Sequence, residues 1–118
     1  MNSIKWLSNF EEHPLFSFLE DSFNTDEKLA LKGNKGSFLN VLIAALQVKK
    51  PIKQLIIAND KEEAAYVYND LQNLLGEQKA LYYPASSKSP YEISRIQNAN
   101  IVQRAEVLSE LNNKAKKI

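Results

Sequence analysis

The chain has 118 residues, a length typical of one ordinary globular domain. Its apolar share of 44%, charged share of 25% and net charge of +1 are those of a folded globular protein and argue against a dedicated nucleic-acid-binding domain. It has no cysteine, which excludes disulfides, thiol catalysis and cysteine-bound metals and suits a reducing cytosol. No apolar run approaches the roughly 18 residues of a membrane helix, and the first residues lack the apolar stretch of a signal peptide. We therefore expect a cytoplasmic protein without membrane contact.

The N-terminal residues predict two short helices that precede the main domain. Residues 3–10 permit an amphipathic helix, and residues 13–23 form a clearer one with Pro14 at its first position. His13, the only histidine, precedes this proline, and we interpret it as a solvated residue at a helix start, not as a ligand or general base. We predict that residues 1–26 are an N-terminal helical segment and that residues 27–118 are the principal α/β subdomain.

Residues 28–46 predict a short strand, a glycine turn and an apolar helix, which is the geometry of a phosphate-binding loop. That loop requires the pattern G-x-x-x-x-G-K-[ST]. When Ser37 is aligned with the Ser/Thr, Gly36 stands in place of the lysine and Lys35 in place of the last glycine. A shift of one residue near a helix start is a rotation of roughly 100°, so Lys35 should point away from the phosphate position. We interpret the stretch as a structural turn, a degenerate phosphate loop that binds no cofactor, made of Gly33, Asn34, Lys35, Gly36 and Ser37. Exchange of Lys35-Gly36 for Gly-Lys is expected to leave the fold intact.

The rest of the chain alternates predicted helices and strands. Apolar spacing predicts helices over residues 37–48, 61–75 and 98–112, and apolar β-branched or aromatic runs predict strands over residues 28–32, 54–58 and 79–83. Tyr66 and Tyr68 are interpreted as packing residues. This alternation predicts a three-layer α/β domain of the phosphate-loop NTPase type, with a small parallel sheet and helices on both faces. Because so small a sheet would be uncovered on its far side, we expect the chain to be an incomplete part of a larger module.

Asp60 follows the second predicted strand, where an NTPase holds its magnesium ion. However, Asp60-x-x-Glu63 also has the spacing of a capping box, in which the carboxylate of Asp60 accepts backbone N–H groups at the start of the next helix. We favour the cap and predict no metal site.

Basic residues are scattered along the chain, a pattern more typical of a solvated surface than of a duplex-binding site. The candidates for direct DNA contact are Lys32, Lys35, Lys49, Lys50, Lys53, Lys88 and Arg95.

An ordered set of short motifs resembles the N-terminal portion of bacterial transcription-repair coupling factors, over about residues 28–112. In that family this portion is itself similar to the helicase-like subunit of the repair excinuclease. The set comprises the strand–turn–helix of residues 28–46, the apolar strand after it, Ala64 with Asp70-Leu71, Pro84-Ala85, Pro90-Tyr91-Glu92, and Arg104 with Leu108. Ser86-Ser87 departs from the family, which tends to have an aromatic and an acidic residue after Pro-Ala.

The resemblance implies a fold like helicase domain 1a with a degenerate phosphate loop. It implies a parent protein that is an ATP-dependent DNA translocase, which displaces stalled RNA polymerase and recruits nucleotide excision repair. ATP and Mg would belong to the motor of that parent, and the excinuclease subunits, RNA polymerase and DNA would be its partners. The segment between Pro84 and Pro90 also looks too short for the DNA-clasping hairpin of the helicase-like excinuclease protein. This segment is then expected to be a non-catalytic scaffold or interaction domain, not an enzyme, without a small-molecule substrate.

Two alternative functions remain open at this stage. An active NTPase domain would need a lysine where Gly36 stands. A free-standing regulatory α/β domain of receiver type would need an acidic cluster around an acceptor aspartate, and only Asn59-Asp60 comes near to that arrangement.

Overall fold

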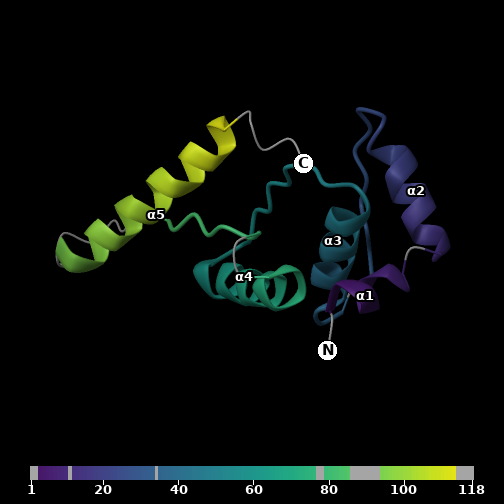
Figure 1. Cartoon of the computed structure of the whole chain (residues 1–118), viewed down its shortest axis with the longest axis horizontal. Coiled ribbons are helices and arrows are strands. Elements are labelled where there is room, and N and C mark those ends of the chain that lie inside the picture. The colour runs from purple at the N-terminus through teal and green to yellow at the C-terminus, as the bar shows by residue number, and fades with distance from the viewer. Residues whose placement is uncertain (1–2, 11, 34, 77–78, 86–93, 114–118) are drawn as a thin grey trace.

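The computed structural model describes residues 3–10, 12–33, 35–76, 79–85 and 94–113. In these ranges it contains five α-helices and no β-strand (Figure 1). The helices are α1 (Ser3–Ser8), α2 (Pro14–Ser22), α3 (Phe38–Lys49), α4 (Lys61–Leu75) and α5 (Ser94–Asn112).

The predicted three-layer α/β fold with a parallel sheet is therefore wrong. Residues 28–32, 54–58 and 79–83 lack strand structure, as the plain ribbon in Figure 1 shows. A short run of β-branched residues indicates only that the segment suits a pleated, half-buried surface. Whether the segment pairs as a strand depends on the segments that lie beside it in the folded chain. Here α1, α3 and α4 bury apolar side chains against one another. The segment 54–58 consequently remains uncovered, with Leu55 83% and Ile57 86% exposed.

Local signals predict the helix ends correctly where capping decides them. The imidazole Nδ1 of His13 accepts the backbone N–H of Leu15 at 3.2 Å, and Pro14 occupies the first position of α2. α4 spans the predicted residues and is followed by its C-cap Gly76, whose φ of 99° is reached most easily by glycine. α5 begins at Ser94, earlier than the predicted Asn98.

The core lies where α1, α3 and α4 contact one another. Leu7 of α1 is completely buried beside Ala44 and Ala45 of α3, and Leu71 and Leu75 of α4 complete this cluster. The α2 helix adds Phe16 and Leu19 to the same core. Residues of the N-terminal helices therefore share one hydrophobic core with α3 and α4.

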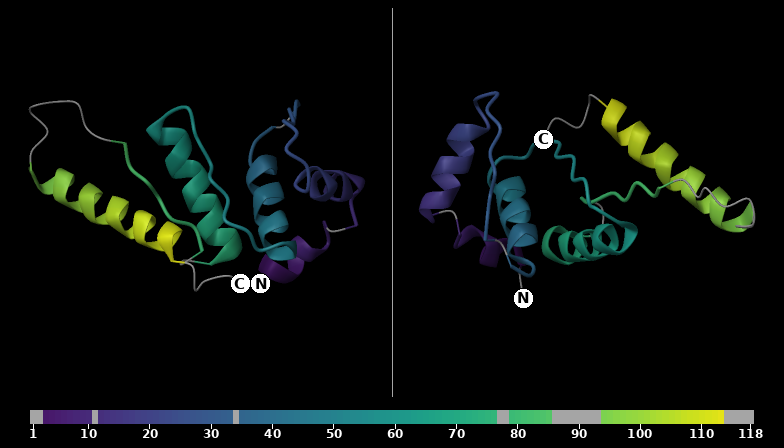
Figure 2. Two further views of the ribbon diagram at one scale, coloured as in Figure 1. Left: turned by 90° about the horizontal axis from the view of Figure 1, so that it is seen from above. Right: turned by 180° about the vertical axis from the view of Figure 1, so that it is seen from behind.

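The α5 helix lies at the edge of the molecule opposite α2 in both views of Figure 2. Its apolar residues Ile101, Val102, Leu108 and Leu111 are each more than half exposed. The radius of gyration is 16.2 Å, compared with about 13.5 Å for a compact domain of this length. The outlying α5 helix accounts for part of this expansion.

Candidate functional site

The glycine turn before α3 has the backbone geometry of a tight turn. Gly33 and Gly36 have φ angles of 82° and 57°, in the left-handed region that favours glycine. The N–H of Phe38 donates to the carbonyl of Lys35 at 3.4 Å, and α3 begins directly afterwards. Asn34 lies outside the described residues.

The side chains of this turn build no phosphate site. Lys35 and Ser37 are exposed, and the hydroxyl of Ser37, at the N-cap position, makes no capping hydrogen bond. In the first turn of α3 the residue Asn40 is 8% exposed, and its side-chain amide donates to a carboxylate oxygen of Asp70 at 2.8 Å. The side-chain amide of Asn40 thus joins α3 to α4 by binding a carboxylate, not a phosphate.

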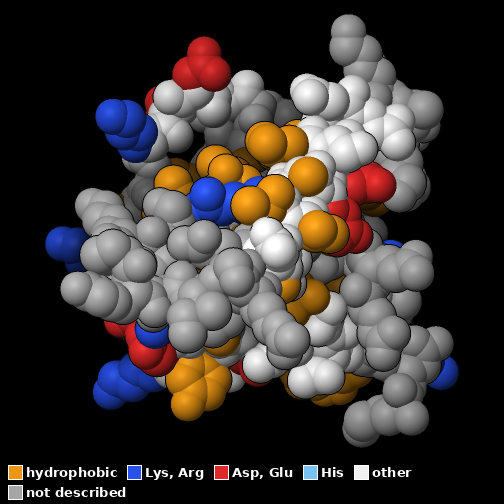
Figure 3. All heavy atoms as spheres, turned by 90° about the vertical axis from the view of Figure 1, so that its left-hand side faces the viewer, with side chains coloured by type: hydrophobic (Ala, Val, Ile, Leu, Met, Phe, Trp, Pro, Cys, Tyr) orange, Lys and Arg blue, Asp and Glu red, His pale blue; other side chains and the backbone are white. Residues whose placement is uncertain are grey.

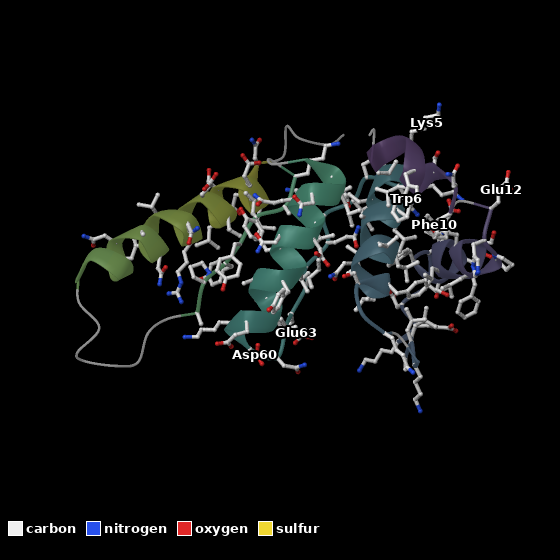
Figure 4. The ribbon with its side chains drawn as sticks, turned by 90° about the horizontal axis from the view of Figure 1, so that it is seen from below. Lys5, Trp6, Phe10, Glu12, Asp60 and Glu63 are labelled. Atoms are coloured by element: carbon white, nitrogen blue, oxygen red, sulfur yellow. The ribbon has the colours of Figure 1, made fainter. Side chains whose placement is uncertain are left out.

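The apolar pocket near the turn is small. It has a volume of about 150 Å³ and is lined by Phe10, His13, Leu15, Phe16, Phe38, Val41 and Leu42. Ligand pockets usually measure about 300–1,000 Å³ and contain a few convergent polar groups. Figure 4 shows Phe10 with Trp6 beside it, and their rings meet edge-to-face with centroids 5.0 Å apart. This pocket is a gap in aromatic packing and is too small for a nucleotide.

Asp60 is the N-cap of α4, as its spacing from Glu63 predicts. Its Oδ1 accepts the backbone N–H of Glu63 at 2.8 Å, and Oε2 of Glu63 accepts the N–H of Asn59 at 2.8 Å. Figure 4 shows Asp60 and Glu63 together at one end of α4. Both carboxylates satisfy helix-end N–H groups. Within the described ranges, no group of three or more His, Cys, Asp or Glu residues could hold a metal ion.

The basic residues considered for DNA contact have separate roles. Lys49 forms a 3.0 Å ion pair with Glu20, and Lys50 donates to the side-chain carbonyl of Asn24 at 3.1 Å. Lys53 donates to three backbone carbonyls at the end of α5, those of Glu110, Leu111 and Asn113. Lys32 and Lys35 are exposed in the turn, while Lys88 and the side chain of Arg95 lie outside what the structure describes. Three of the seven candidates thus link parts of the chain.

Two of the motifs that carry the family resemblance meet in space. Nε of Arg104 donates to the carbonyl of Pro84 at 2.8 Å, and its guanidinium lies over the ring of Tyr83, 5.1 Å from the ring centre. Pro84 is buried. This contact attaches α5 to segment 79–84. Ser86-Ser87, Pro90-Tyr91-Glu92 and the expected absence of a hairpin lie in residues that the structure does not describe.

The two tyrosines of α4 differ in their surroundings. The ring of Tyr68 packs against Tyr82 with centroids 5.6 Å apart, and its hydroxyl oxygen accepts from the amide of Gln72. Tyr66 is 74% exposed, so its predicted packing role is wrong.

Sequence reasoning missed the exposed apolar side chains of the extended segments and α5. Leu55 and Ile57 have the largest exposed fractions of the large apolar side chains described, and others are Leu29, Leu31, Leu81, Tyr83, Ile101 and Val102. Figure 3 looks at the molecule from the α5 side and shows hydrophobic side chains gathered around Lys or Arg side chains. Apolar runs of this kind are typical of buried strands. The sequence therefore shows that these residues are apolar but does not indicate that they are exposed.

Comparisons of the chain with protein-family models, curated proteins and solved structures find no match. Among the described residues, no helix is both long enough and apolar enough to cross a membrane.

Proposed function

We propose that this chain is a non-catalytic interaction domain. The observation that carries the proposal is the exposure of apolar side chains on the extended segments and on α5, with Leu55 and Ile57 more than four-fifths exposed. Monomeric proteins rarely expose contiguous apolar patches of more than a few hundred Å², and larger patches usually mark interaction sites. The scaffold for this surface is the helical core of α1, α3 and α4.

The glycine turn supports the non-catalytic part of this proposal. Gly36 stands where a phosphate loop places its lysine, and the first turn of α3 uses its buried amide to bind the carboxylate of Asp70. By the family resemblance, ATP and Mg would belong to a motor elsewhere in a larger parent protein.

The parent that we propose is a bacterial transcription-repair coupling factor, on the strength of the ordered motifs over about residues 28–112. This chain would then support an ATP-dependent DNA translocase of the cytoplasm. The partners would be excinuclease subunits, RNA polymerase and DNA, reached through the parent. The contact between Arg104 and Pro84 gives two of these motifs a shared structural role.

Purified partners test this function directly. The immobilised chain should bind RNA polymerase or at least one of the separately purified excinuclease subunits in biolayer interferometry, and the Leu55→Ser/Ile57→Ser variant should weaken that binding. Failure to bind any of these proteins would overturn the interaction role in coupled repair.

Calorimetry with Mg-ATP should show no binding. A micromolar Kd would instead favour the nucleotide-binding alternative suggested by the positive-φ glycine turn.

A further inference from the structure

Two basic side chains attach the helix α5 to the rest of the described structure. Nε of Arg104 donates to the carbonyl of Pro84 at 2.8 Å, and Nζ of Lys53 donates to three carbonyls at the C-terminal end of α5, of which that of Leu111 is nearest at 2.8 Å. We propose that α5 is a detachable arm, which Arg104 and Lys53 hold closed and which opens as a unit while α1, α3 and α4 stay folded. This opening would occur whether or not the chain binds the partners proposed above.

The hydrophobic core receives no side chain from α5. Among residues 98–112 no residue is buried, and the core residues and the apolar residues packed at their edge come from other segments. Within the described ranges, α1, α3 and α4 contact one another, whereas α5 has no comparable contact with another helix. Both views of Figure 2 accordingly show α5 at the edge of the molecule. Elements with few buried apolar contacts open at a lower free energy than the core.

The less exposed face of α5 is mostly polar. Asn100, Arg104, Val107 and Glu110 are half-buried, and their spacing of three or four residues places them on one side of the helix. The apolar residues Ile101, Val102, Leu108 and Leu111 are instead each more than half exposed. Opening of the arm therefore removes little apolar surface from contact, and its main cost is the loss of the polar contacts.

The two attachments lie at different points of the helix and together fix its position. The guanidinium of Arg104 lies over the ring of Tyr83, 5.1 Å from the ring centre, and its hydrogen bond reaches the buried Pro84 at the middle of α5. The ammonium of Lys53 lies at the C-terminal carbonyls, where a positive charge is favoured by the helix dipole. Because each attachment is a contact of one cation, substitution of two residues should release the arm.

Native-state amide hydrogen exchange tests the arm. In the unaltered chain, the amides of α5 should exchange about 100-fold faster than the core amides of α3 after correction for intrinsic rates, because α5 opens without global unfolding and an undocked helix of its length is only marginally stable. Arg104→Ala/Lys53→Ala should speed the exchange of α5 by a further factor of about ten or more, because two hydrogen-bonding cations are lost, and should leave α3 unchanged.

The choice of alanine separates undocking from weakening of the helix. Alanine is the best helix former, so Arg104→Ala cannot speed exchange by lowering the helix propensity of α5. Lys28→Ala/Lys32→Ala is the matched control, since it removes the same charge from two exposed positions and should leave the exchange of α5 unchanged.

A pair of spin labels measures the movement itself. The chain has no cysteine, so Asn69→Cys in α4 and Ser109→Cys in α5, both at exposed positions, define one labelled pair. Double electron–electron resonance should show a narrow distance beside a broader minor set, and the share of the broad set should grow in Arg104→Ala/Lys53→Ala.

Four results would overturn the proposal. In the unaltered chain, equal protection of α5 and α3 would make α5 part of the cooperative core. Exchange of α5 that the double substitution leaves unchanged, or one narrow distance in both chains, would remove the role of the two cations. Exchange of α3 and α4 that accelerates together with α5 would show that these contacts support the whole fold and not a separate arm.

Discussion

The amide of Asn40, in the first turn of α3, donates a 2.8 Å hydrogen bond to the carboxylate of Asp70 in α4. Asn40 is the buried polar residue among those described, and Asp70 is partly exposed, so this partly buried bond joins the two helices. Asp70 also belongs to the family-like motif Asp70-Leu71, whose other member is a core residue. The motif therefore has a structural explanation in helix packing.

Replacement of Asn40 by Ala should destabilise the fold by about 1–3 kcal/mol, because it removes a hydrogen bond to a charged group and leaves the carboxylate of Asp70 without this donor. Urea unfolding followed by circular dichroism measures the change. Asn69→Ala is the control, since Asn69 is an exposed neighbour on α4, and its effect should stay within about 0.5 kcal/mol. Equal losses in the two variants would contradict the structural role of the pair.

Replacement of Leu7 by Ala should cost about 2–5 kcal/mol, as is usual for truncation of a fully buried leucine. The residue belongs to α1, so the result tests whether the N-terminal helices unfold together with α3 and α4. Leu55→Ala, at an 83% exposed position, should change the free energy of unfolding by less than about 0.5 kcal/mol. A Leu7→Ala variant with unchanged stability would show that α1 is not part of the cooperative core.

The cap of α4 predicts different outcomes for two substitutions of Asp60. Asp60→Ala should destabilise the chain by about 1 kcal/mol, whereas Asp60→Asn should be nearly neutral, because asparagine caps helices about as well as aspartate. Thermal unfolding monitored by circular dichroism compares the two. If Asp60 held magnesium, added magnesium would raise the Tm of the unaltered chain, and neither substitution would preserve that rise.

The glycine turn corrects one expectation from the sequence. The sequence predicts that exchange of Lys35-Gly36 for Gly-Lys leaves the fold unharmed, but Gly36 has a φ of 57°. A Cβ atom there meets no atom within 4 Å, so the expected cost is backbone strain of about 1–2 kcal/mol. Gly36→Lys alone should show this loss in urea unfolding, while Gly36→Asn, which tolerates the left-handed region better, should lose less. Equal losses from lysine and asparagine would contradict this explanation.

Calorimetry with Mg-ATP on the variant in which Lys35-Gly36 is exchanged for Gly-Lys then tests whether the lysine alone restores nucleotide binding.

The amino-acid sequence by itself determined the features that depend on near neighbours in the chain. Pro14 and His13 mark the start of α2, Asp60 and Glu63 mark the start of α4, and Gly76 marks its end, because caps and positive φ angles involve residues a few positions apart. The apolar spacing of residues 61–75 likewise predicted the helix α4, whose Leu71 and Leu75 lie in the core.

Only the tertiary structure decided what happens to the apolar runs between the helices. Burial of residues 54–58 would require a neighbouring strand and a covering layer, and both are supplied by distant parts of a chain or by a partner. Because α1, α3 and α4 bury one another, Leu55 and Ile57 remain at the surface, and the pairing of Asn40 with Asp70 and of Arg104 with Pro84 follows from that packing. Local pattern indicates which residues are apolar, whereas the arrangement of the helices determines which of them are covered.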